Sequence, residues 1–240
     1  MPEPTHHPSG PLAVAVALAA AAGFVDAHVY VNVTPVFVAN MSGNLIHLGI
    51  FVGDGAWRTA LASLLTIGAF TAGVVVATAH HHRQVVRDRT VRPTALLAAE
   101  AALLAGLTAW MAVASLAFTA EPRAADYPVL LVAGLAMGLQ AAALRRVGEV
   151  AVATTYGTGA IVRIGEKIVL AAHRADRPTE HRRRVAIAVL AVVLASYVAG
   201  AIAATIAGHG VALLAIPTAV VAGCAWATRP SGDPRNPPSS

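Results

Sequence analysis

Long apolar stretches separated by short polar segments dominate this chain. Six of these stretches carry one charge or none over about 20 residues, the length that an α-helix needs to cross a bilayer. They run from Pro11 to Val33, Trp57 to Ala79, Pro93 to Ala120, Tyr127 to Leu144, Val185 to Ala207 and Val211 to Thr228. The pattern therefore predicts an all-α fold, a polytopic membrane helix bundle with six spans.

Two further segments, 36–52 and 150–172, are apolar at their ends and polar within. The first reads VFVANMSGNLIHLGIFV and places two amides, a hydroxyl and a glycine near its centre. Irregular backbone persists at bilayer depth only where protein or water satisfies its polar groups. We therefore expect two broken, re-entrant segments, although a short segment also spans where the bilayer adapts to it.

The two broken segments share one sequence pattern. Residues 42–49 read SGNLIHLG and residues 158–165 read TGAIVRIG, an offset of 116 positions (158 − 42). Each half of the chain then holds one span, one broken segment and two more spans. Three crossings are an odd number, so the second half enters the membrane with opposite polarity and forms a 3+3 inverted repeat. The alternative is chance similarity between two apolar stretches that contain Gly and Thr.

This repeat divides the chain into four parts. A cytoplasmic N-terminal tail covers residues 1–10, and the first and second transmembrane repeats cover residues 11–120 and 121–228. The remaining residues, 229–240, read RPSGDPRNPPSS. A Pro- and Ser-rich composition of this kind predicts a disordered cytoplasmic tail.

Composition and charge support a membrane protein and argue against nucleic-acid binding. The chain is 57% hydrophobic and 12% charged, whereas soluble domains have about 25% charged residues. The net charge is +5, but the arginines cluster in the short connections 83–92, 145–146 and 174–184. Short loops rich in Lys and Arg stay in the cytoplasm. We therefore expect both termini to be cytoplasmic and the bilayer to be the main partner.

Three polar side chains stand inside predicted spans. Asp26 lies deep in the first span, where an ionisable group is by default a functional hypothesis, here a cation or proton site. The alternative is an aspartate that binds nearby backbone. Glu100 in the third span is a candidate proton relay or a structurally paired carboxyl. Gln140 in the fourth span is expected to bond to the first broken segment.

The broken segments add further candidates for solute contact. A helix that starts near Ser42 directs free backbone N–H groups at the break, which attract an anion or a carboxylate. Ser42 and Thr158 are equally good candidates to cap those helices. The expected substrate or ion site consists of Asp26, Asn40, Ser42, Gly43, Asn44, Gln140, Thr158 and Gly159.

The sequence gives no sign of a metal site, a cofactor or an enzyme. The single cysteine, Cys224, excludes an intramolecular disulfide and a cysteine metal cluster. Three consecutive histidines, His80 to His82, cannot all face one ion on a helix. No assembled nucleophile and base can be recognised.

Several motifs resemble the bacterial YoaK family of multi-span inner-membrane proteins. They are GFVDA at 23–27, VANMSGN at 38–44, GLQAA at 138–142 and Thr158-Gly159, and the resemblance covers roughly residues 12 to 228. It implies a location in the bacterial inner membrane and no settled activity. Ala141 stands where the resemblance leads us to expect an Asn after Gln140.

These patterns favour a membrane transporter or channel-like carrier of a small molecule or ion. Its site would lie between the two broken segments near the bilayer midplane. The alternative is a non-transporting membrane assembly or regulatory protein, in which the polar residues of the broken segments pair with each other. A membrane enzyme is less favoured, and a homo-oligomer is compatible with either function.

Overall fold

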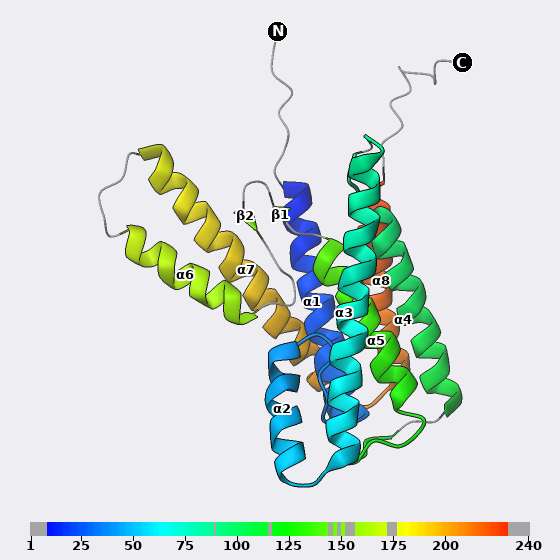
Figure 1. Ribbon diagram of the computed structural model, residues 1–240. Helices are drawn as coiled ribbons and strands as arrows, with labels where there is room; N and C mark the ends of the chain where they lie inside the picture. The colour runs from blue at the N-terminus through cyan, green and yellow to red at the C-terminus, as the bar shows by residue number, and fades with distance from the viewer. Residues whose placement is uncertain are drawn as a thin grey trace, which may run out of the picture.

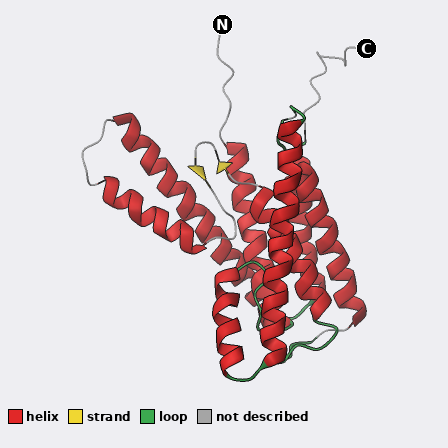
Figure 2. Ribbon diagram, in the orientation of Figure 1, coloured by secondary structure: helices red, strands yellow, loops and turns green. Residues whose placement is uncertain are grey.

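The computed structural model describes residues 9–88, 90–114, 117–143, 146–147, 150–151, 157–171 and 177–229. These residues form a bundle of α-helices with one very short pair of strands (Figures 1 and 2). The elements are α1 (Ser9–Asn32), α2 (Met41–Gly53), α3 (Trp57–Val86), α4 (Thr94–Ala114), α5 (Tyr127–Ala143), β1 (Arg146–Val147), β2 (Val150–Ala151), α6 (Gly157–Ala171), α7 (Arg177–Ala207), the 3-10 helix η1 (Val211–Leu214) and α8 (Ala215–Ala227).

The expected all-α fold holds for these residues apart from β1 and β2. These two-residue strands are antiparallel, with Arg146 opposite Ala151 and Val147 opposite Val150. Four helices, α1, α3, α4 and α7, are long and apolar enough to cross a membrane. The other two predicted spans correspond to shorter apolar helices, Tyr127–Ala143 and Ala212–Ala227.

Helix ends differ from the predicted span ends where the flanking residues are polar helix formers. Helix α3 continues to Val86 rather than ending at Ala79, and α7 begins at Arg177 rather than Val185. Arginine has a high helix propensity, so a helix continues past its apolar part. Helix α3 stops only at a turn that contains Asp88 with a φ of 49°. Hydropathy therefore marked the apolar part and not the end of the helix.

The bundle buries several polar side chains within an apolar core and exposes large apolar side chains on its outside. Fully buried polar side chains include Asn44, Glu100 and Gln140. Large apolar side chains cover the outer faces of the helices, and Val113 and Ile206 are 83% and 81% exposed. Soluble monomers rarely expose such continuous apolar surface, so this distribution is the one that a lipid environment requires.

Glycine allows α1 and α7 to cross in close contact. A Cβ atom on Gly23 of α1 would collide with the backbone of Tyr197, and one on Gly200 of α7 would collide with the backbone of Ala20. Gly23 therefore contacts the backbone at Tyr197, three residues before Gly200. Gly200 contacts the backbone at Ala20, three residues before Gly23. Small residues at such crossings let helices approach closely in a membrane.

A second crossing, between α3 and α5, is built in the same way. A Cβ atom on Gly138 of α5 would collide with the backbone of Phe70, and one on Gly73 of α3 would collide with that of Leu135. Again each partner lies three residues before the opposite glycine. Together the two crossings hold α1, α3, α5 and α7, four helices that come from both halves of the sequence.

Helix α2 reaches only part of the way along the bundle. After α1 ends, residues 33–40 form a non-helical loop, and the 13-residue α2 follows. Figure 1 shows α2 beside the first half of α3, at the end of the bundle opposite to the beginning of α1. In the same view α6 and the first half of α7 lean away from the other helices. The start of α2 therefore lies part-way along the length of the bundle.

Candidate functional site

Asp26 joins three separate parts of the chain. Its Oδ1 accepts hydrogen bonds from the backbone N–H groups of Val38, at 2.6 Å, and Ala39, at 2.8 Å. Its Oδ2 accepts a hydrogen bond from the hydroxyl of Tyr197 on α7. The side chain is 2% exposed. One buried carboxyl group therefore connects α1, the loop before α2, and α7.

The glycine crossing places Tyr197 within reach of Asp26. Gly23 lies one helical turn before Asp26 on α1, and its missing side chain admits the backbone of Tyr197. The tyrosine ring then extends along α1 to the carboxylate. The sequence patterns did not single out Tyr197, although a phenol within an otherwise apolar span needs a hydrogen-bond partner.

Asn44 fixes the loop to α2. Its Nδ2 donates to the carbonyl oxygen of Phe37 at 2.6 Å, and its Oδ1 accepts from the N–H of Phe37 at 2.9 Å. The side chain is fully buried. The side-chain amide therefore bonds to both the N–H and the C=O of Phe37, a loop residue outside regular secondary structure.

Asn44→Ala is expected to destabilise the protein by about 2 kcal/mol, because the N–H and C=O of Phe37 lose their partner together. Thermal unfolding in detergent measures this change. Ser42→Ala is the matched control, since Ser42 lies two residues away on the exposed side of α2. Equal melting temperatures for the two variants would contradict this role of Asn44.

The cap of α2 is Asn40, and not Ser42 as the sequence suggested. Asn40 Oδ1 accepts from the N–H of Gly43 at 3.2 Å and from the hydroxyl of Ser42 at 2.8 Å. Gly43 lies inside the helix rather than at a sharp bend. A Cβ atom there would come within 2.8 Å of the Phe37 ring, so this glycine makes room for the loop.

Aromatic rings close the outer side of this loop. The ring of Phe37 stacks on Tyr30 of α1, with centroids 4.5 Å apart, and on His47 of α2, with centroids 5.5 Å apart. His47 also contacts Phe51, at 5.4 Å. Contacts of this kind add about 0.5–1.5 kcal/mol each, so they hold the loop, α1 and α2 together.

The carboxylate of Asp26 lies where an anionic ligand was expected. The N–H groups that it binds, those of Val38 and Ala39, come directly before the cap of α2. The amino end of a helix carries partial positive charge and favours a negative group. In the conformation described here the protein's own carboxylate therefore fills this position.

The other candidate residues lie apart from this cluster. Gln140 on α5 donates from Nε2 to the carbonyl oxygen of Leu18 on α1 at 2.9 Å, while its expected bond to the first broken segment stays a prediction. Thr158 and Gly159 lie in the first turn of α6, and the side chain of Thr158 is outside the described part of the structure. Glu100 lies on α4 and is fully buried. Of the candidate residues whose side chains the structure describes, Asp26, Asn40, Ser42, Gly43 and Asn44 come together.

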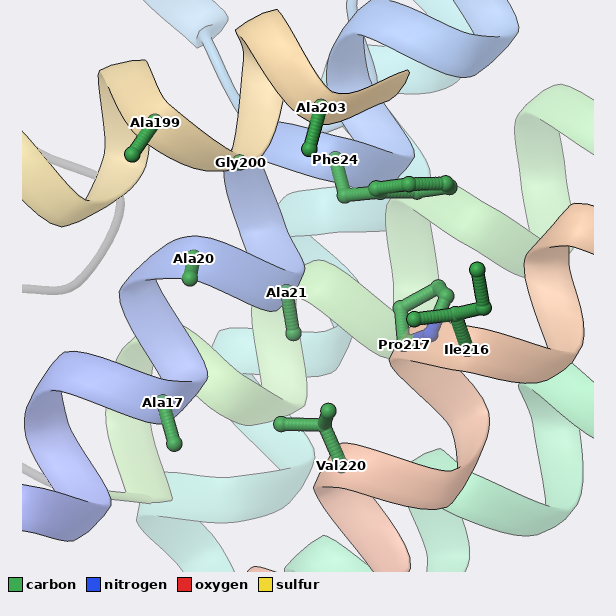
Figure 3. Close-up of a pocket in the computed structure, with 10 residues that line it drawn as sticks. All are labelled: Ala17, Ala20, Ala21, Phe24, Ala199, Gly200, Ala203, Ile216, Pro217 and Val220. Carbon is green, nitrogen blue, oxygen red and sulfur yellow. The ribbon is translucent and has the colours of Figure 1, made fainter. Parts of the chain in front are cut away.

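An apolar cavity lies next to α1. It has a volume of about 340 Å³ between α1, α7 and α8 (Figure 3). The side chains that line it, among them Phe24, Ile216, Pro217 and Val220, carry no hydrogen-bonding group. This cavity therefore offers nothing to bind a polar solute.

Within the described ranges no three His, Cys, Asp or Glu side chains gather in a way that could hold a metal ion.

Comparison with known proteins identifies the family. Residues 14–227 match the family model described as "Protein of unknown function (DUF1275)". The chain belongs to this family. It is also 31% identical over 153 residues to the UPF0700 transmembrane protein YoaK of Bacillus subtilis (strain 168), a match that covers 61% of this chain and 62% of that protein. No solved structure matches the chain.

Membership in the DUF1275 family agrees with the YoaK-like motifs in the sequence. The matched range, 14–227, contains the Asp26 region, the loop before α2, and Gln140. Since the relative is a transmembrane protein and the helices expose apolar faces, the chain is a membrane protein.

Proposed function

We propose that this DUF1275 protein is a transporter or channel-like carrier of a small molecule or ion in the bacterial inner membrane. The observation that carries the proposal is the short helix α2, whose start is held within the bundle by Asp26. Interrupted segments of this kind form the substrate sites of many transporters near the bilayer midplane. The proposal assigns the protein no enzymatic step, no cofactor and no nucleic-acid partner.

Helix contacts support an inverted repeat in which α1–α4 correspond to α5–α8. Helix α1 packs on α7 as α5 packs on α3, α2 packs on α3 as α6 packs on α7, and α8 packs on α1 as α4 packs on α5. The glycine crossings obey the same relation, because Gly23 corresponds to Gly138 and Gly200 to Gly73. Chance similarity of two short motifs does not account for paired contacts at these other positions.

The proposed topology has six spans, α1, α3, α4, α5, α7 and η1–α8, with α2 and α6 in re-entrant segments. The 17 residues of α5 extend about 25 Å at 1.5 Å per residue, at the short end of what crosses a bilayer. The beginning of α1 and the end of α8 lie at the same end of the bundle (Figure 1). This arrangement supports two cytoplasmic termini.

In this proposal a solute binds between the two broken segments. Asp26, Asn40, Ser42, Gly43 and Asn44 form the side that α1 and α2 contribute, while Gln140, Thr158 and Gly159 belong to the other half. The N–H groups that Asp26 now holds become available to a solute when the carboxylate moves away from them. Transport would then exchange an internal bond for a bond to the solute.

Access to Ser42 from both sides of the membrane tests the proposal. Ser42→Cys in a Cys224→Ala background is expected to react with a membrane-impermeant maleimide in right-side-out and in inverted vesicles. Val75→Cys, on α3 and 60% exposed, is the control and is expected to face lipid. Reaction of Ser42→Cys from one side only would contradict a pathway through the break.

A second function has one observation in its favour. Asp26 accepts hydrogen bonds from the N–H of Val38 and the hydroxyl of Tyr197. Asn40 accepts from the N–H of Gly43, and Asn44 donates to the carbonyl oxygen of Phe37. Such internal pairing is what a non-transporting assembly or regulatory protein requires, including one that acts as a homo-oligomer. Labelling from one side in the vesicle experiment is the result that this second function predicts.

A further inference from the structure

Glu100 is a buried acid without a hydrogen-bond donor among the described residues. It lies on the buried face of α4 in line with Leu96, Leu97, Leu104 and Leu107, at helical spacings of three and four. Its side chain has no exposed area. Neither carboxyl oxygen has a hydrogen-bond partner within the described residues.

The helices around Glu100 bring no positive charge to it. Helix α4 packs on α5, η1 and α8. The titratable side chains on those elements are Tyr127 of α5 and Cys224 of α8. The hydroxyl of Tyr127 donates to the carbonyl oxygen of Arg58 on α3, while Cys224 is close enough to interact electrostatically with Glu100. A thiol provides no compensating charge for a carboxylate.

Asp26 and Glu100 are therefore opposite cases of a buried acid. Asp26 receives two backbone N–H groups and a phenol hydroxyl, the donors that stabilise a carboxylate. Glu100 receives no donor from the described part of the chain. An ionised carboxylate without partners in such surroundings costs many kcal/mol, so a group in this position takes up a proton instead.

We propose that Glu100 is a proton-binding site within the membrane and that it, rather than Asp26, couples proton binding to the movement of the two halves. Its position favours this coupling, because α4 and α8 are the last helices of the two halves and pack against each other. Relative movement of the halves changes what surrounds Glu100. The coupling role rests on the proposed transport function, whereas the bound proton does not.

Dicyclohexylcarbodiimide tests for the bound proton. This apolar reagent enters the bilayer and reacts with protonated carboxyl groups. The acid proton moves to a carbodiimide nitrogen as the carboxyl oxygen bonds to the central carbon, and the acyl group then migrates to nitrogen to give a stable N-acylurea. No atom leaves and nothing is oxidised. We expect one adduct per chain at neutral pH in the full-length protein, located at Glu100 by peptide mass.

The controls separate Glu100 from other acids. Glu100→Gln is expected to fold with an unchanged melting temperature and to lose the adduct, whereas Asp26→Asn should keep it. Glu121 lies exposed in the loop before α5 and should not carry the adduct. The same labelling in folded Glu100→Gln, or no adduct at Glu100 in the folded wild-type protein, would overturn the proton site.

A second experiment tests coupling without a known solute. The ratio of outside to inside maleimide labelling of Ser42→Cys is expected to change at least threefold between acidic and alkaline pH. Glu100→Gln, which mimics the protonated acid, should remove this pH dependence. Equal pH dependence with and without Glu100 would overturn the coupling role. Labelling from one side only, together with an adduct at Glu100, would contradict transport and leave the proton site intact.

Discussion

Asp26→Ala is expected to lower the free energy of unfolding by about 3 kcal/mol or more, the largest effect of any polar substitution in this protein. Hydrogen bonds to charged groups contribute about 1.5–3 kcal/mol each, and such bonds are weaker on average inside membrane proteins. The substitution removes the acceptor of Val38, Ala39 and Tyr197 together. Thermal unfolding of the purified protein in detergent measures the loss.

Two matched variants divide this effect among the partners of Asp26. Asp26→Asn keeps one oxygen for the N–H groups of Val38 and Ala39 and should have an intermediate stability. Tyr197→Phe removes only the bond between α7 and Oδ2 and should cost about 1 kcal/mol. The expected order of melting temperatures is wild type, Tyr197→Phe, Asp26→Asn and Asp26→Ala. Equal stability of Asp26→Ala and Tyr197→Phe would show that the loop does not depend on the carboxylate.

Gly200→Ala is expected to destabilise the protein by about 3 kcal/mol, although alanine is the better helix former by about 1 kcal/mol. The added methyl group would collide with the backbone of Ala20, which cannot move without separating α1 from α7. Overpacking of this kind typically costs 1–3 kcal/mol and occasionally more. The loss of the Asp26–Tyr197 bond at the same crossing adds to this cost.

A glycine with open space around it is the control for this substitution. Gly68 of α3 has nothing within 4 Å of the position of an added Cβ, so Gly68→Ala should be neutral or slightly stabilising. Gly73→Ala, at the corresponding position of the α3–α5 crossing, should cost about as much as Gly200→Ala if the halves are equivalent. Melting temperatures of the three variants provide the comparison. A neutral Gly200→Ala would mean that α1 and α7 do not cross as closely as described.

In the proposed repeat, the two halves differ at two functional positions. Gly138 corresponds to Gly23, so Ala141, three residues later, corresponds to Asp26. Phe70 takes the place of Tyr197 at the second crossing. The polar connection is therefore present at the α1–α7 crossing and absent at the α3–α5 crossing. If the halves move against each other, the polar connection at one crossing and its absence at the other make the two resulting conformations differ in stability.

Much of the candidate site was visible in the sequence, but its bonding was not. Asp26, Asn40 and Asn44 stand out because they are polar within apolar stretches, and the structure brings them together. Tyr197 lies 171 positions after Asp26, and no local pattern connects the two. The bond from Gln140 to Leu18 was not foreseen either, since which helix a buried amide faces depends on packing between distant segments.

The sequence by itself determined the membrane environment, the helical fold and the approximate helix positions. These properties depend on local hydropathy and on the spacing of residues along one helix. Both can be read from a stretch of about 20 residues. The tertiary structure decided which polar groups are paired. It gave Asp26 three donors and left Glu100 without one among the described residues. Both are single acids in apolar helices, and only the contacts between helices distinguish an anchored carboxylate from one that holds a proton.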